Sequence, residues 1–277
     1  MQAIEARHGI ADWRTAVPGD SRNPMKPAAT GRILFWRGGS LWIGLAGEPS
    51  GCHAHHAVQI TLPFPGGRVR FQSPSGRWQS YTAALVAADQ PHSFEARGQL
   101  VAQVFVEPES RDGRHLQQRY GTEGIVALPS GVPERQIAGL ASAYESRASD
   151  ATLIALARAA SATLSGASPE AVQVPDARIA RALELIRERL GEKMPLTAVA
   201  AAVHLSPDRF RHLFMQETGV GFRPYVLWLR LECSLAAYVA GETLTEAAYI
   251  GGFADSAHLS RTFKSMFGIT PASVRPE

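Results

Sequence analysis

The sequence GFADSAHLSRTFKSMFGITP, from Gly252 to Pro271, has a helical period, with Leu and Phe on one side and Arg, His, Lys and Ser on the other. A near-copy, HLSPDRFRHLFMQETGVGF, runs from His204 to Phe222. Each stretch follows a short Ala-rich segment, which begins at Leu196 in the first copy and at Leu244 in the second. The repeat predicts two units, each made of a short helix, a tight turn and a longer helix closed by glycine.

Local signals bound the longer helix of each unit. Ser206-Pro207 predicts an N-cap with proline at the first helical position, and Asp255 or Ser256 can cap the second helix. Gly219 and Gly268 are expected to take left-handed C-terminal conformations. The residues predicted to face inward are Phe210, Leu213, Phe214, Leu259, Phe263 and Phe267. This is the helix-turn-helix pattern twice over.

The outward faces of these helices are candidates for contact with double-stranded DNA. Arg donates two hydrogen bonds to guanine, and Asp accepts from cytosine. Lys264 and Arg223 are better suited to phosphates, which fix register. A single basic hairpin is usually only a solvated helix pair, but two matched copies favour DNA binding. The candidate DNA contacts are Asp208, Arg209, Arg211, His212, Arg223, Ser256, Ala257, His258, Ser260, Arg261 and Lys264.

The segment between the two units predicts one long helix. RPYVLWLRLECSLAAYVAGE is helical in pattern from Pro224, and about 17 residues at 1.5 Å each span about 25 Å. Such a separation suits two recognition helices in successive major grooves, which lie about 34 Å apart along DNA.

The carboxyl-terminal third also carries a family pattern. The residues that match it are Arg230-Leu231, Gly252-Phe253, His258-Leu259, Arg261, Phe263-Lys264, Phe267-Gly268 and Thr270-Pro271. With these motifs, the chain from about residue 176 to 275 resembles the DNA-binding domain of AraC/XylS transcription regulators. Ala257 replaces a commoner polar residue, and Pro207 and Asp208 make the first recognition helix less basic, so the DNA sequence preference stays open.

The amino-terminal part has a different pattern. From residue 31 to 128, short apolar segments rich in Val, Ile, Phe and Trp alternate with Gly and Pro turns, which predicts a sandwich or barrel. Residues 1–30 are expected to be an extension and 167–176 a linker. Two helices are predicted in 129–166, with Asp150 as a cap, and they either pack on the barrel or pair with a second copy. The expected fold is α+β: a β-barrel, two dimerisation helices, a linker and an all-α domain over 177–277.

Histidines of this part suggest a binding site. In GEPSGCHAHHAVQITLPFPG, the spacing of His53, His55 and Gln59 resembles the first motif of the cupin barrel, with Gln59 where the metal-binding Glu would stand. His92 matches the histidine of the second cupin motif. His53 and His55 lie two apart on a strand and face the same side. Three imidazoles would suit Zn, Ni, Cu or Fe(II). His56 next to them is expected to be exposed.

Three outcomes stay open for this site: a metal site, a metal-free pocket for a small molecule, and a vestigial site. The missing carboxylate weakens the first, because it would balance the charge of the cation. Aromatic residues at strand spacing are more often core than ligand contacts. The effector-binding candidates are Trp36, Trp42, His53, His55, Gln59, Trp78, His92 and Phe94, of which His53, His55 and His92 are the metal candidates.

Composition limits the class of protein. The 277 residues fit two domains, and a hydrophobic fraction of 45% is enough for two cores. No apolar run approaches a transmembrane span, the first residues do not form a secretory signal, and only two cysteines occur, so a cytoplasmic protein without a membrane partner is expected. The net charge of +3 permits a nucleic-acid partner without demonstrating one.

Three functions are compatible with these features. The first is a transcription regulator that binds promoter or operator DNA as a homodimer, responds to a small-molecule or metal effector, and contacts RNA polymerase if it is an activator. The second is a metal-dependent cupin enzyme with an appended helical module, against which Gln59 argues. The third is a DNA-binding protein without effector, whose barrel only dimerises. The first is favoured, and no catalytic residue is predicted.

Overall fold

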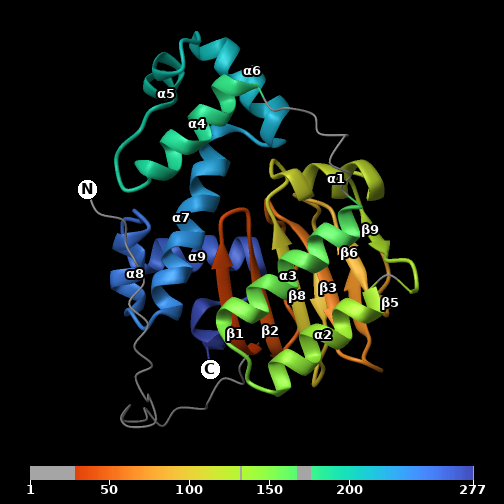
Figure 1. Ribbon diagram of the computed structural model, residues 1–277. Coiled ribbons are helices and arrows are strands. Elements are labelled where there is room, and N and C mark those ends of the chain that lie inside the picture. Colours follow the sequence, from red (N-terminus) through yellow and green to blue (C-terminus); the bar gives the residue numbers. More distant parts are fainter. Residues whose placement is uncertain (1–28, 132, 167–175, 277) are drawn as a thin grey trace.

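The computed structural model describes residues 29–131, 133–166 and 176–276. Nearly all of the predicted extension (1–30) and of the predicted linker (167–176) lies outside the described residues. The described chain forms a β-rich domain, which carries three helices, and a helical domain (Figure 1).

The β-rich domain contains two sheets. The larger sheet has the order β10-β1-β2-β8-β3-β6-β9, and the smaller one β5-β4-β7; every pair is antiparallel except β1 with β10. Within the described ranges, their ladders do not join into one closed barrel. The strands are β1 (Ala29–Trp36), β2 (Gly39–Ala46), β3 (Val58–Pro63), β4 (Val69–Gln72), β5 (Gln79–Tyr81), β6 (Ala84–Val86), β7 (Ser93–Glu95), β8 (Leu100–Val106), β9 (Ile125–Ala127) and β10 (Val274–Pro276).

Alternation along the strands gives the larger sheet two buried faces. In β3, Ile60 and Leu62 join the core beneath the helices, whereas Gln59 and Thr61 belong to the opposite face. Both of these polar side chains are buried, and the amide of Gln59 donates a 2.9 Å hydrogen bond to the hydroxyl of Thr61. The strand pattern therefore places polar groups inside the domain, on the side of the histidines.

The two helices expected after residue 129 cover the larger sheet (Figure 1). Leu140, Leu153 and Leu164 share a core with strand residues of that sheet, so these apolar side chains are buried within one chain. Ser149 rather than Asp150 caps α3, because the Ser149 hydroxyl accepts from the amide of Thr152. The helix α1 (Arg111–Tyr120) was not predicted from the sequence. The helices are α1 (Arg111–Tyr120), α2 (Pro133–Glu145) and α3 (Asp150–Ser165).

The helical domain follows the predicted repeat. The linking helix α7 has 18 residues, or about 27 Å, and begins two residues before Pro224. After α9, a short 3-10 turn (Pro271–Ser273) leads into β10, which extends the larger sheet beside β1. No helix in the described ranges is long and apolar enough to cross a membrane. The remaining helices are α4 (Ala177–Glu188), α5 (Leu196–Ala202), α6 (Pro207–Thr218), α7 (Phe222–Val239), α8 (Leu244–Ile250) and α9 (Ser256–Phe267).

Candidate DNA-binding surface and histidine site

The two helix-turn-helix units have the same construction. In the first, the hydroxyl of Ser206 caps α6 and Pro207 opens it; in the second, the carboxylate of Asp255 caps α9. Both helices end at glycines in the left-handed region, Gly219 at φ 79° and Gly268 at φ 70°. The caps and the helical ends predicted from the sequence are confirmed, and the inward side chains named above are all buried.

The candidate DNA contacts lie outside this core. Ser256 and Ser260 are partly exposed, and the other nine predicted side chains are exposed. In the first unit, Arg211 donates a 2.5 Å hydrogen bond to Asp208, which neutralises part of the positive charge of α6. In the second unit, Arg261 and Lys264 stand one turn apart on the exposed side of α9. The two units therefore present different charges on similar scaffolds.

The second unit packs on the β-rich domain through the carboxyl-terminal end of α9. The ring of Phe267 stacks on Trp42 at 4.7 Å between centroids and meets Phe105 edge-on at 5.8 Å. The amide of Gly51 donates a 3.0 Å hydrogen bond to the carbonyl oxygen of Gly268. One apolar core therefore spans both domains.

Ion pairs join the first half of the helical domain to the β-rich domain. Arg187 of α4 donates to Glu107 at 2.6 Å and lies 3.6 Å from Glu109. Arg114 of α1 donates to Glu217 of α6 at 3.0 Å. Burial raises the pKa of Glu107, so this carboxylate depends on Arg187 to stay ionised inside the interface.

His56 lies in the same interface, and the expectation that it is exposed was wrong. The side chain is 4% exposed, because Tyr225 of α7 covers it with ring centroids 5.5 Å apart. Its Nε2 lies 3.1 Å from a carboxylate oxygen of Glu109. Burial opposes its charge, but the nearby carboxylates of Asp89, at 4.0 Å, and Glu109 raise the pKa of His56 to about 9. It therefore carries a proton at neutral pH and pairs with Glu109.

The structure brings His53, His55 and His92 together. His53 and His55 come from the segment before β3 and His92 from the residue before β7, and the backbone of His53 pairs with that of His92. One ring nitrogen from each lies within 4.8 Å of the other two, and all three side chains are buried. Burial, with His55 nearby, lowers the pKa of His53 to about 4 and that of His92 to about 2, and burial also lowers the pKa of His55. All three imidazoles are neutral at physiological pH.

Each of these imidazoles is held by a backbone carbonyl. Nδ1–H of His53 donates to Gly51 at 2.7 Å, that of His55 to Ala57 at 2.9 Å, and that of His92 to Gln90 at 2.8 Å. These bonds fix the proton on Nδ1 and leave an unprotonated Nε2 on each ring. The Nε2 of His55 faces Oε1 of Gln59 at 2.9 Å. The buried Nε2 of His92 has no hydrogen-bond partner among the described residues.

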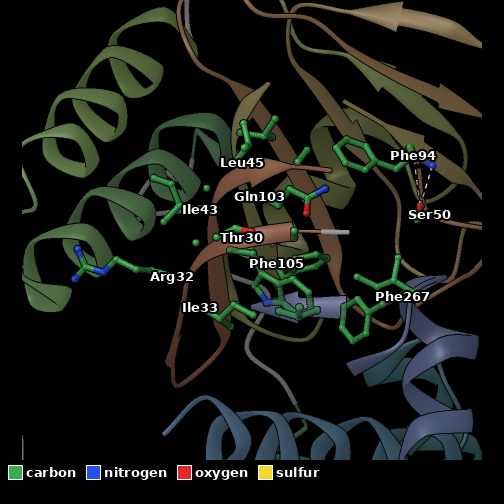
Figure 2. Close-up of a pocket in the computed structure, with 18 of the residues that line it drawn as sticks. Thr30, Arg32, Ile33, Ile43, Leu45, Ser50, Phe94, Gln103, Phe105 and Phe267 are labelled. Atoms are coloured by element: carbon green, nitrogen blue, oxygen red, sulfur yellow. Dashed lines mark hydrogen bonds between the residues drawn. The ribbon is translucent and has the colours of Figure 1, made fainter. Parts of the chain in front are cut away.

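A cavity of about 80 Å³ lies between the sheets beside this cluster (Figure 2). Of the eight effector candidates, Trp42, His53, Gln59 and Phe94 line the cavity, whereas Trp36, His55, Trp78 and His92 do not. Trp36 packs against the core under the helices, and Trp78 lies beneath the guanidinium of Arg70. The helical domain closes one wall of the cavity with Phe267, Ile269 and Val274.

Comparisons with known proteins agree with the helical repeat. A family model described as a helix-turn-helix domain matches residues 199–277. The chain is 31% identical over 107 residues to the transcriptional activator RhrA of Rhizobium meliloti (strain 1021), covering 37% of this chain and 34% of that protein. It is 32% identical over 104 residues to the arabinose operon regulatory protein of Salmonella typhimurium, covering 36% of each chain. Over its carboxyl-terminal third, the chain is therefore similar to AraC-family transcription regulators.

The sequence match spans about a third of the length of the curated relatives. A solved structure extends the likeness in fold: ToxT of Vibrio cholerae with a bound unsaturated fatty acid has a TM-score of 0.52 at 14% identity, covering 83% of this chain and 91% of that one. The named relatives are transcription regulators, not enzymes, so the metal-dependent enzyme weighed above finds no support.

Several residues of the interface were missed in the sequence. From the sequence, no role is assigned to Glu107, Glu109 or Arg187, and Phe267 is predicted only as an inward residue of its own helix. The one available signal was the pair of carboxylates after the apolar strand QLVAQVFV. It does not reveal a partner 80 residues away.

Proposed function

We propose that this AraC-family chain is a sequence-specific DNA-binding transcription regulator whose β-rich domain senses an effector. The observation that carries the proposal is the pair of helix-turn-helix units, each with its polar amino-terminal flank exposed and its apolar side buried. Duplex DNA repeats its major groove every helical turn, and two such units joined by a helix of about 27 Å suit adjacent grooves. Such a regulator works in the cytoplasm, where the promoters are.

The second unit supplies the stronger base contacts in this proposal. Small side chains at Ser256 and Ala257 let α9 approach the base edges, where Arg261 donates to guanine and His258 donates one further bond. Lys264 and Arg223 contact phosphates and set the register. In the first unit, Arg209 and His212 contact bases, while Arg211 is hydrogen-bonded to Asp208, which keeps its guanidinium from the DNA.

The effector acts through the contact between the domains. A ligand shifts a conformational equilibrium only when it binds two arrangements with different affinity. The cavity meets this condition, because the helical domain contributes Phe267 and Ile269 to its wall. The fatty acid held by the similar ToxT fold supports effector binding in this architecture. A homodimer, and RNA polymerase as a partner of an activator, remain predictions.

Selection of bound sequences from a random DNA pool, followed by fluorescence anisotropy on the selected site, tests the proposal. Arg261→Ala is expected to weaken specific binding by about 1–3 kcal/mol and to relax preference at its base pair. Arg158→Ala is the matched control: it removes the same exposed charge from α3, on the β-rich domain, and leaves the affinity unchanged. Unselective binding by the wild type, or equal affinity of Arg261→Ala and wild type, contradicts the proposed function.

A further inference from the structure

The histidine cluster is built for a ligand that accepts electron pairs. In each of the three buried, neutral imidazoles, Nδ1–H donates to a backbone carbonyl oxygen. Each ring is therefore left with a lone pair on Nε2. Hydrogen-bonding the opposite ring nitrogen to a carbonyl is how proteins orient metal-binding histidines. A core histidine normally satisfies both nitrogens, whereas the buried Nε2 of His92 meets no donor in the part of the chain that the structure describes.

Gln59 adds a fourth donor with suitable geometry. Its Oε1 lies 2.9 Å from Nε2 of His55, and both atoms are acceptors when Nδ1 carries the proton. Two ligands at right angles, each about 2.05 Å from one metal, are separated by about 2.9 Å. The facing pair is therefore arranged as neighbouring ligands of one ion. One ring nitrogen of each of the three histidines lies within 4.8 Å of the others, which brings three further candidate ligands to the same place.

The cavity beside the cluster is small for an organic effector. Pockets for organic ligands of ordinary size occupy about 300–1,000 Å³. The cavity beside the cluster holds about 80 Å³, which suits an ion with a few waters. Nitrogen donors with one amide oxygen suit first-row transition metals, whereas Mg²⁺ and Ca²⁺ prefer oxygen-only sites.

The cluster is also joined to the recognition helix of the second unit. The backbone of Gly51 connects the cluster to α9. Its carbonyl oxygen accepts from Nδ1–H of His53, and its amide donates to the carbonyl oxygen of Gly268 at the end of α9. A Cβ at Gly268 would lie 2.8 Å from Nδ1 of His53 and 2.3 Å from the oxygen of Gly51. Phe267 covers the ring of His55 at 5.9 Å between centroids.

We propose that the effector is a divalent first-row transition metal, held by the three buried imidazoles and Gln59, and that its binding stabilises the docking of residues 267–268 on the β-rich domain. The part of this inference in which metal binding regulates transcription rests on the proposed function. The metal prefers the docked arrangement because docking completes the shell around the imidazoles and holds the peptide that orients His53. Undocking exposes the cluster and releases Gly51.

Cobalt(II) alone is the probe, because its visible absorption reports nitrogen ligands and coordination geometry. Untagged, EDTA-stripped full-length protein is expected to bind one Co²⁺, which Zn²⁺ or Ni²⁺ displaces and Mg²⁺ does not. His92→Ala is expected to lose about 100-fold in affinity. His115→Ala, which removes a histidine of α1 outside the cluster, is expected to bind like wild type. Absent saturable binding, or equal affinity in the two variants, overturns the metal site.

A second variant guards against misfolding of His92→Ala. Gln59→Glu keeps the shape of the side chain and adds the negative charge that this neutral donor set lacks. It is expected to bind Co²⁺ at least about tenfold more tightly, because a carboxylate offsets the charge of the ion. Unchanged or weakened binding in a folded Gln59→Glu protein contradicts the assignment of Gln59 as a ligand.

The link to α9 has a matched pair of variants. Gly268→Ala and Gly219→Ala place the same methyl group at left-handed helix ends, but a Cβ at Gly219 has no atom within 4 Å among the described residues. Gly268→Ala is expected to weaken Co²⁺ binding about tenfold or more, and Gly219→Ala to leave it within about twofold. Equal effects overturn the coupling but not the metal site.

DNA affinity of the stripped protein keeps this inference separate from the proposed function. Specific DNA binding without metal binding removes only the effector assignment. Metal binding without specific DNA binding removes the regulator and leaves the site.

Discussion

The two recognition helices end alike and meet different surroundings. Gly219 closes α6 at the surface, whereas Gly268 closes α9 against the backbone of Gly51. The residue before each glycine differs accordingly: Thr218 bonds within its own helix end, and Phe267 reaches into the β-rich domain. The two copies of the motif therefore differ in what the carboxyl-terminal end of the second helix contacts. Both present polar flanks for DNA, and the end of α9 in addition packs on the rings of Trp42 and Phe105 in the β-rich domain.

The largest effect expected from this comparison comes from the paired residues before the glycines. Phe267→Ala removes a ring that packs on Trp42, Phe263 and Trp228, and is expected to lower the free energy of unfolding by about 3–5 kcal/mol. Thr218→Ala removes one hydroxyl bonded within the helix end and is expected to cost about 1 kcal/mol. Urea denaturation followed by circular dichroism measures both. Equal losses would mean that the two ends are energetically alike.

A second prediction concerns the ion pairs on the side of the first unit. Arg187→Ala leaves Glu107 and Glu109 buried without this partner and is expected to cost about 3 kcal/mol at pH 7.5. Arg114→Ala leaves the more exposed Glu217 and is expected to cost about 1 kcal/mol.

The cost of Arg187→Ala should shrink as the pH falls. Burial raises the pKa of Glu107 above its ordinary value, and loss of the cation raises it further. A carboxyl with a raised pKa destabilises the fold while it is ionised, and protonation relieves that cost. Urea denaturation between pH 7.5 and pH 5 measures the difference between variant and wild type. A difference that grows on acidification would show that Glu107 does not need Arg187.

The smallest effect separates the DNA faces of the two units. Asp208 is almost fully exposed and pairs with Arg211, and the pair has no obvious equivalent in α9 among the residues predicted to contact DNA. Asp208→Ala is expected to strengthen DNA binding by less than about 1 kcal/mol and to steepen its salt dependence by about one phosphate contact. Anisotropy titrations over a range of salt concentrations measure both. An unchanged slope would place Arg211 away from DNA.

The sequence predicted what short-range chemistry determines. Ser206, Gly219 and Gly268 act within a few residues of their own helix ends, and the repeat supplied the register of the buried rings. The short strands also follow from local spacing. The prediction that His53 and His55 share a strand was wrong, because β3 begins only at Val58 and both residues lie in the segment before it. The convergence of His92 with them was predicted by the resemblance to a cupin motif, not by spacing.

The contacts between the domains could not be predicted, because they join residues far apart in the chain. His56 was expected in solvent, and only the approach of Glu109 and Tyr225 buries it. The pairing of β10 with β1 joins opposite ends of the described chain and has no local signal in three residues. Helix α1 was missed because it is mostly polar, with Gly113 and Leu116 as its buried residues.

Hydrogen–deuterium exchange of the full-length protein tests the central comparison most directly. Trp42→Ala removes the ring that holds Phe267 from the β-rich side, and Trp36→Ala removes a tryptophan that packs elsewhere. Faster exchange in residues 264–269 of Trp42→Ala, with residues 215–220 unchanged and with both segments unchanged in Trp36→Ala, is the expected result. Equal acceleration of both segments in Trp42→Ala, or no change in either, would contradict the assignment of the Trp42–Phe267 contact as the one that holds the end of the second recognition helix.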